Sequence, residues 1–175
     1  TDQTGCQASD TVIVTSVDPL VPVSILSGPV SCFGGNDGSA TIGVSGGTAP
    51  YNYTWNTTPA QDSSTAIGLT AGVYEVFVTD VNGCALTPIS ITVNEPPVLV
   101  IDTIIPTDPL CNNGDDGSVL VIPSGGTPSY FYDWSGSSSI TNSANNLTAG
   151  TYGVTITDAN GCTTNGSTFL NDPLM

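Results

Sequence analysis

The sequence predicts an all-β protein made of tandem immunoglobulin-like (PKD-like) β-sandwich domains arranged head to tail. Three observations support this fold class. Apolar and polar residues alternate in short runs, as in half-buried strands, and no segment shows helical periodicity. Gly, Pro, Asn, Asp and Ser interrupt these runs about every 8–12 residues, as turns do in sandwiches. A unit of about 78 residues also occurs twice, and this length suits one small domain.

The repeat divides the chain into three parts. Four motifs recur in the same order, so that residues 32–39, 46–55, 69–74 and 79–84 return as residues 111–118, 125–134, 147–152 and 157–162. Residues 1–6 match the last motif once more. We therefore expect residues 1–18 to be the C-terminal part of a preceding repeat, holding the end of its F–G hairpin and its strand G. Complete repeats follow at residues 19–96 and 97–175. Proline marks each boundary and stiffens the link there.

The strands of the first complete repeat are predicted in order along the chain. Strand A is expected at residues 21–26, B at 39–45, C at 51–56, a variable middle segment at 60–68, F at 73–79 and G at 86–94. This makes about seven strands, lettered as in immunoglobulin-like folds. Tyr74, Val76 and Val78 share one face of a strand, which is the period of two that a half-buried strand requires.

Four aromatic residues are predicted to lie in the two cores. Trp55 and Trp134 occupy the place of the buried tryptophan on strand C. Tyr74 and Tyr152 each follow Leu-Thr-Ala-Gly and resemble the tyrosine that closes the E–F bend of immunoglobulin-like domains. We expect all four to pack inside the sandwiches rather than to stack on a ligand.

The charge of the chain excludes several classes of function. It holds 15 acidic residues and no Lys, Arg or His, for a formal net charge of −15. Nothing can neutralise phosphate groups, so neither nucleic acid nor an anionic membrane surface is an expected partner. No run of 18 apolar residues exists, so this segment is not expected to insert into a membrane. Stability must come from burial, backbone ladders, disulfides or bound cations.

We do not expect an enzyme. Without His, Lys or Arg there is no imidazole base, no amine nucleophile and no cationic clamp. A carboxylate pair could still catalyse hydrolysis, as in glycosidases. The aspartates lie mostly in turn-like contexts, however, and no close pair can be named from the sequence.

Together these motifs resemble the SprB repeat. The pattern is Cys-x-Gly-x-x-Asp-Gly-Ser, Gly-Gly-Thr-x-Pro-Tyr-x-Tyr-x-Trp, Leu-x-Ala-Gly-x-Tyr and Thr-Asp-x-Asn-Gly-Cys. The second copy departs from it at Asn112-Asn113, which precede Gly114, and at Ser129, where a second proline is common. The family occurs in very long surface proteins of Bacteroidetes, including gliding-motility adhesins. The resemblance implies export by the type IX secretion system, a cell-surface location and a structural or adhesive role.

Five cysteines occupy two positions of the repeat, which in an exported chain implies disulfides. Cys6, Cys84 and Cys162 share one position, and Cys32 and Cys111 share the other. One pairing lies within each repeat, Cys32–Cys84 and Cys111–Cys162. It leaves Cys6 for the missing preceding segment.

Strand order favours a second pairing, between repeats. Cys32 precedes strand B, whereas Cys84 lies in the F–G hairpin at the other end of the sandwich, roughly 25–30 Å away. A disulfide needs Cα atoms within about 7 Å. In a head-to-tail stack Cys32 would instead meet Cys162, Cys84 would bond the preceding repeat and Cys111 the following one. Because the sandwich topology is itself inferred, both pairings stay open here.

Two further kinds of site, for calcium and for glycosylation, are suggested by short sequence patterns. The sequences around Asp37, Asp80, Asp115, Asp116 and Asp158 could bind calcium through carboxylate and carbonyl oxygens, or could simply form tight turns. No other cofactor is expected. Thr11 and Thr103 follow aspartate and precede an apolar residue, which resembles the O-glycosylation pattern of Bacteroidetes. They could equally be ordinary strand threonines.

The sequence thus predicts a structural repeat segment of an extracellular filament or cell-surface adhesin. The domains would act as a disulfide-stabilised spacer, each adding roughly 35–40 Å. The expected partners are neighbouring repeats of the same chain and, through edge strands, other copies in a fibre. The alternative is a carbohydrate- or surface-binding module within a large secreted protein, which would need an exposed aromatic platform.

Overall fold

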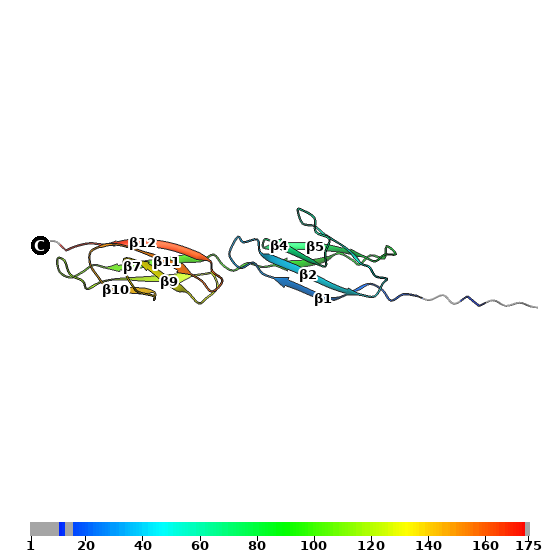
Figure 1. Ribbon diagram of the computed structural model, residues 1–175, viewed down its shortest axis with the longest axis horizontal. Coiled ribbons are helices and arrows are strands. Elements are labelled where there is room, and N and C mark those ends of the chain that lie inside the picture. Colours follow the sequence, from blue (N-terminus) through cyan, green and yellow to red (C-terminus); the bar gives the residue numbers. More distant parts are fainter. Residues whose placement is uncertain (1–10, 13–15, 174–175) are drawn as a thin grey trace, which may run out of the picture.

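The computed structural model describes residues 11–12 and 16–173, and within these residues all regular structure is β-strand. Figure 1 shows two sandwiches lying end to end, the first in blue to green and the second in green to red. The predicted all-β class and the tandem immunoglobulin-like arrangement are confirmed. Among the described residues, no helix could span a membrane. The strand predicted within residues 1–18 lies mostly outside the described part of the chain.

The first domain contains six strands between residues 21 and 93. They are β1 (Val21–Gly28), β2 (Gly38–Ser45), β3 (Asn52–Trp55), β4 (Thr65–Leu69), β5 (Gly72–Thr79) and β6 (Ile89–Val93). One sheet has the order β1-β2-β4 and the other β3-β5-β6, with every described pairing antiparallel. This places the β1–β2 loop at the C-terminal end of the domain and the β5–β6 turn at its N-terminal end.

The second domain repeats this topology between residues 100 and 170. Its strands are β7 (Val100–Thr107), β8 (Gly117–Ser124), β9 (Phe131–Ser135), β10 (Ser143–Leu147), β11 (Gly150–Thr157) and β12 (Thr163–Leu170). The sheets are β7-β8-β10 and β9-β11-β12. Each strand aligns with a strand of the first domain, so equivalent residues can be compared position by position.

The expected count of about seven strands is wrong, since each domain has six in the described residues. The middle segment forms only β4, because the stretch before it takes its hydrogen bonds through a side chain. Gln61 donates its Nε2 to the Ile67 carbonyl (3.0 Å) and accepts the Ile67 N–H at Oε1 (2.9 Å). Ile67 pairs with Ser39 of β2 on one side, and on the other side the Gln61 amide takes the place of a neighbouring strand in the first domain.

The predicted aromatic residues pack in two separate cores. Trp55 and Trp134 are buried, and each indole Nε1 donates to a loop carbonyl 2.8 Å away, that of Ser63 and Thr141 respectively. A buried indole N–H needs such a partner.

The two tyrosine corners differ in depth. Tyr152 is buried and donates its hydroxyl to the Thr148 carbonyl at 2.9 Å. Tyr74 makes the equivalent bond to Thr70 at 3.1 Å but is only half-buried, at the edge of its core. The core assignment therefore holds fully for three of the four residues and partly for Tyr74.

Candidate functional site

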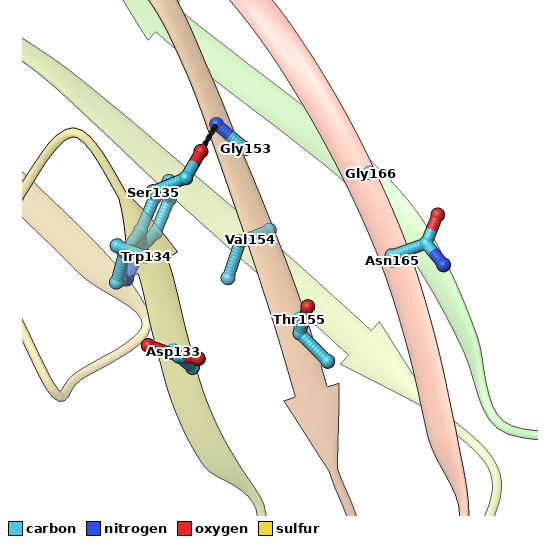
Figure 2. Close-up of a pocket in the computed structure, with 8 residues that line it drawn as sticks. All are labelled: Asp133, Trp134, Ser135, Gly153, Val154, Thr155, Asn165 and Gly166. Carbon is cyan, nitrogen blue, oxygen red and sulfur yellow. Dashed lines mark hydrogen bonds between the residues drawn. The ribbon is translucent and has the colours of Figure 1, made fainter.

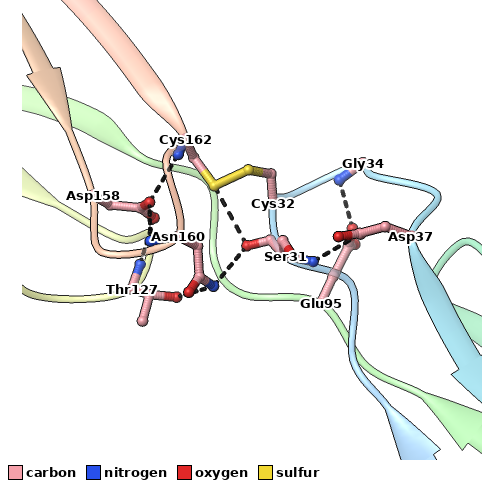
Figure 3. Close-up of a disulfide and its surroundings, with 9 residues drawn as sticks. All are labelled: Ser31, Cys32, Gly34, Asp37, Glu95, Thr127, Asp158, Asn160 and Cys162. Atoms are coloured by element: carbon pink, nitrogen blue, oxygen red, sulfur yellow. Dashed lines mark hydrogen bonds between the residues drawn. A yellow bond between two sulfur atoms is a disulfide. The ribbon is translucent and has the colours of Figure 1, made fainter.

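The two domains meet at a junction that carries a disulfide between Cys32 and Cys162 (Figure 3). Cys32 lies in the β1–β2 loop of the first domain, and Cys162 lies at the end of the β11–β12 turn of the second. Their Cα atoms are 5.7 Å apart, in the usual range for a disulfide. The structure therefore shows the pairing between repeats that the strand order favoured. We call residues 31–37 the cysteine loop, and residues 158–162 together with Thr127 the acceptor turn.

A hydrogen bond crosses the junction beside the disulfide. Asn160 donates its Nδ2 to the Ser31 carbonyl at 2.9 Å, and the same nitrogen donates to Thr127 Oγ1 at 3.0 Å. Cys162 Sγ lies 3.4 Å from the Ser31 oxygen; because this sulfur carries no hydrogen, the contact is a close approach and not a hydrogen bond. The cysteine loop is thus held by one covalent bond and by a polar contact to its backbone.

Asp158 shapes the acceptor turn from inside. Its side chain is 2% exposed. Oδ1 accepts the N–H groups of Asn160 and Cys162, both at 2.9 Å, and Oδ2 accepts that of Thr127 at 2.8 Å. Burial alone would raise the pKa of this carboxyl, but these backbone hydrogen bonds outweigh it and leave the pKa below its ordinary value. An ionised aspartate therefore fixes both the turn and the direction of Cys162.

Two carboxylates hold the cysteine loop from the other side. Asp37 Oδ1 accepts the Ser31 N–H at 2.9 Å, and the hydrogen bonds from Ser31 lower the Asp37 pKa. Glu95, directly after the last strand of the domain, accepts the Gly34 N–H at 2.8 Å. Gly34 has a φ of 71°, a left-handed conformation that glycine adopts without strain. Cys32 is therefore presented by a loop with fixed ends.

The linker between the domains is clamped by two glycines. Gly126 donates its N–H to the Pro97 carbonyl at 2.8 Å. Gly125 packs so closely that a Cβ on it would overlap the Val98 carbonyl oxygen. Leu99 is 8% exposed, and with Val98 and Phe33 it lines a cavity of about 350 Å³ beside the disulfide. Both the linker and the disulfide thus fix how the domains join.

Cys84 and Cys111, the other two cysteines among the described residues, are not paired with each other. Cys84 and Cys111 are exposed and free, and Cys6 lies outside the described residues. The alternative pairing, Cys32–Cys84 with Cys111–Cys162, is therefore not the one present in the structure.

The structure does not gather the predicted calcium ligands. Among the described residues, no three acidic or cysteine side chains lie close enough to share an ion. Asp80 repeats the arrangement of Asp158, accepting the N–H groups of Thr48, Asn82 and Cys84. Its pKa is lowered, chiefly by the bond from Thr48. Asp116 accepts the Leu110 N–H, as Asp37 accepts that of Ser31. Asp115 is exposed. The geometry supports the reading of these residues as turns, and calcium binding stays an untested prediction.

The two threonines proposed as sugar sites are both exposed. Thr11 precedes the first domain, and Thr103 lies on β7. Nothing in the geometry distinguishes them further, so glycosylation stays a prediction.

Sequence reasoning missed Asn160 and Glu95. The segment from Asp158 to Gly161 is predicted from the sequence only as a calcium site or a tight turn, and Glu95 only as part of a proline-marked boundary. Their recurrence at Asn82-Gly83 and, as an acidic residue before proline, at Asp172 was the available signal.

The phenylalanines were also missed. Phe33, Phe77, Phe131 and Phe169 are all exposed, although the Tyr and Trp residues face inward or the domain edges.

A second cavity, of about 360 Å³, lies on the β9-β11-β12 sheet of the second domain (Figure 2). It forms above Gly153, whose N–H takes the Ser135 Oγ as acceptor at 3.1 Å. Asp133, Thr155 and Asn165 also line it. Its one aromatic residue, Trp134, is buried, so the cavity offers no exposed ring for a sugar to stack on.

Comparison with known proteins supports both the repeat and the fold. The SprB repeat model matches residues 27–59 and 103–139. No curated protein sequence matches significantly. Three N-terminal domains of the highly immunogenic outer capsid protein (Hoc) of bacteriophage RB49 are similar in structure, with 20% identity, a TM-score of 0.51, and coverage of 86% of this chain and 58% of that one.

A second similar structure is a C-terminal 282-residue fragment of intimin, solved with the intimin-binding domain of its translocated receptor. It has 14% identity, a TM-score of 0.46, and coverage of 86% of this chain and 64% of that one. This chain spans less than two thirds of either structure. Likeness at such identities concerns the fold alone, whereas the two family matches fall one in each domain. Each of the two domains therefore contains a region that matches the SprB repeat model.

Proposed function

We propose that this chain is a structural segment of an extracellular filament or cell-surface adhesin, in which β-sandwich domains joined by disulfides act as a spacer. The observation that carries the proposal is the junction. A disulfide, a hydrogen bond to the Ser31 backbone and a clamped linker all connect the same two domain ends. Two independent binding modules on a flexible string would need none of these contacts.

The family matches support the surface location, and the charge of the chain is consistent with it. The two SprB repeat matches support an extracellular, adhesin-type protein, and the immunoglobulin-like fold is compatible with it. A net charge of −15 keeps long repeated chains soluble and apart. From the resemblance to the SprB repeat family we further propose three properties. The chain is part of a Bacteroidetes surface protein, it is exported by the type IX secretion system, and it takes part in gliding motility.

A carbohydrate-binding module is the less favoured function. It would need a platform of exposed aromatic rings beside a cavity. Phe131 and Phe169 are exposed but do not line the cavity of Figure 2, and Phe33 is the single aromatic residue that lines the cavity at the junction. An enzymatic role finds no support either, because the buried carboxylates Asp80 and Asp158 already accept backbone N–H groups.

The proposal is tested by ¹⁵N relaxation of the oxidised chain. We expect both domains to report one shared, anisotropic rotational tumbling, as in a rod. Replacing Cys162 by serine should let the domains tumble separately and faster, because only the linker and one hydrogen bond remain. Cys84→Ser is the matched control, since Cys84 is exposed and outside the bond. Separate tumbling in the oxidised wild-type chain would refute a spacer role.

A further inference from the structure

We propose that the acceptor turn of the first domain is a binding site for the cysteine loop of another SprB repeat, and that Cys111 of a second copy can occupy it through a Cys84–Cys111 disulfide. The inference rests on the proposed function and names a partner for the Cys84 turn and for the Cys111 loop. It follows from comparing the Cys32–Cys162 junction with the equivalent turn and loop, which have no such partner among the described residues.

The acceptor turn is built alike in both domains. In the first domain it consists of Thr48 and residues 80–84, and Asp80 takes the place of Asp158. Asp80 accepts from Thr48, Asn82 and Cys84 at 2.9, 2.9 and 2.8 Å, against 2.8, 2.9 and 2.9 Å for the equivalent bonds of Asp158. The turn of the first domain therefore has the same geometry although none of the described residues forms a loop bound to it.

The cysteine loop is also built alike. In the second domain it consists of residues 110–116. Asp116 accepts the Leu110 N–H at 3.0 Å, and Asp172 accepts the Asn113 N–H at 2.9 Å, as Asp37 and Glu95 do in the first domain. Asn113 even keeps the positive φ of Gly34, at 59°. Cys111 is thus presented in the same way as the bonded Cys32.

The contacts that differ are those a partner would supply. Asn160 Nδ2 donates both to Thr127 and across the junction, whereas Asn82 Nδ2 donates to Thr48 Oγ1 alone in the described residues, at 3.0 Å. At the other end, Leu110 is 83% exposed, while its equivalent Ser31 is half-buried against the second domain. Cys84 and Cys111 are exposed, and Cys32 and Cys162 are not.

These differences select one occupant. The Cys84 turn offers an amide donor and a thiol, and the Cys111 loop offers a backbone carbonyl and a thiol, the pair that meets in the filled junction (Figure 3). Two acceptor turns would not reproduce this pairing, because neither supplies the cysteine-loop carbonyl that Asn160 contacts in the filled junction. The bond forms by exchange with a disulfide oxidant such as oxidised glutathione. One cysteine thiolate attacks oxidised glutathione, which gives a protein–glutathione mixed disulfide and releases one reduced glutathione. The second cysteine thiolate attacks this mixed disulfide and releases a second reduced glutathione. The two thiols thus lose two protons and two electrons to the oxidant.

The experiment mixes two variants of this 175-residue chain in a glutathione redox buffer. One carries Cys6→Ser and Cys111→Ser and keeps Cys84; the other carries Cys6→Ser and Cys84→Ser, keeps Cys111 and is ¹⁵N-labelled. Random pairing gives a twofold excess of mixed dimers over either like dimer. We expect an excess of about tenfold or more, as the oriented hydrogen bond and matched ends favour the mixed pair. Mass spectrometry of the labelled dimers measures the ratio.

Asn82→Ala in the variant that keeps Cys84 should reduce this excess toward the random value. Asn52→Ala, at an exposed position of β3, is the matched control and should leave it unchanged. A random ratio, or an excess that survives Asn82→Ala, overturns the inference. Disulfide mapping of the same samples separates the two ideas. If Cys32–Cys162 is present but pairing is random, the proposed function stands and this inference fails; if Cys32–Cys162 is absent, the proposed function fails.

Discussion

Asp158 shows how single residues replace the missing cations of this chain. With no Lys, Arg or His in the sequence, a buried carboxylate cannot be paired with a side-chain cation. It is stabilised instead by three backbone N–H groups, whose hydrogen bonds favour the ionised form and lower its pKa. In the first domain, hydrogen bonds from backbone N–H groups likewise lower the pKa of Asp80. These two aspartates therefore stabilise the folded turns as acceptors of backbone N–H groups.

Asp158→Asn should destabilise the second domain in a pH-dependent way. The amide would turn an N–H donor toward at least one backbone donor and lose the negative charge. Because the folded pKa lies below the ordinary value of 3.8, the stability from ionised Asp158 is full above that value and is lost as the pH falls through the folded pKa. The gap in unfolding free energy between wild type and variant should therefore be constant from pH 5 to 7 and should narrow below pH 4 in urea titrations.

Asp115→Asn is the matched control for this prediction. Asp115 is an exposed aspartate of the same domain, and its replacement should produce no such gap. A gap that stays constant down to pH 2 would mean that the ionised form of Asp158 contributes nothing special to folding.

The loops and linkers, more than the strands, determine how the domains join. Two glycines allow the linker to lie directly against the second domain, and the equivalent glycines Gly46 and Gly47 clamp residues 18–19 in the first. The strands differ more than these loops do. Pro88 has no N–H to give to a ladder, and β6 starts only at Ile89, whereas β12 begins directly after its turn.

Gly125→Ala should disrupt the junction. Its φ of 72° already disfavours a side chain by about 1–2 kcal/mol, and the new Cβ would also collide with the Val98 carbonyl. Gly161→Ala is the matched control, because its φ is 87° but nothing lies near the added Cβ. We expect oxidative refolding of Gly125→Ala to give much less Cys32–Cys162 bond than Gly161→Ala, measured by mapping disulfides after chymotrypsin digestion. Equal yields would show that linker packing does not align the two cysteines.

The strands and the ends of the sandwich were predictable, whereas the contacts across the junction were not. Alternation placed Trp55 and Tyr152 in the cores, and strand order placed Cys32 and Cys84 at opposite ends, because both follow from periodicity and topology. The predicted number of strands was wrong around Gln61, because its side-chain amide makes the hydrogen bonds that the sequence pattern attributes to a further backbone strand. The role of Asn160 was not predicted for a related reason, since it depends on a hydrogen bond to a carbonyl 129 residues away in the sequence.

At the scale of the whole molecule, the acidity of the chain is the property that cations could alter. We predict that neither excess calcium nor EDTA shifts the melting temperature beyond the small effect of magnesium, which serves as the control for charge screening. The described carboxylates are dispersed, with no cluster of three among them. A specific ion at a hundred times its Kd would add about 2.7 kcal/mol, or a rise of roughly 10–20 °C for a domain of this size. Such a rise, measured by calorimetry, would restore the calcium hypothesis.

The Cys32–Cys162 bond also sets how far the molecule can stretch. A pulling force that enters at residue 19 and leaves at residue 173 can travel through residues 19–32, the disulfide and residues 162–173. This covalent route is about 26 residues, or roughly 90 Å when fully drawn out at about 3.4 Å per residue, against roughly 500 Å for the same chain without the bond. Two folded domains already span roughly 70–80 Å. Even complete unfolding would therefore lengthen the molecule very little. A fibre built in this way would be nearly inextensible, and a force applied at one end would be transmitted to the other almost undiminished.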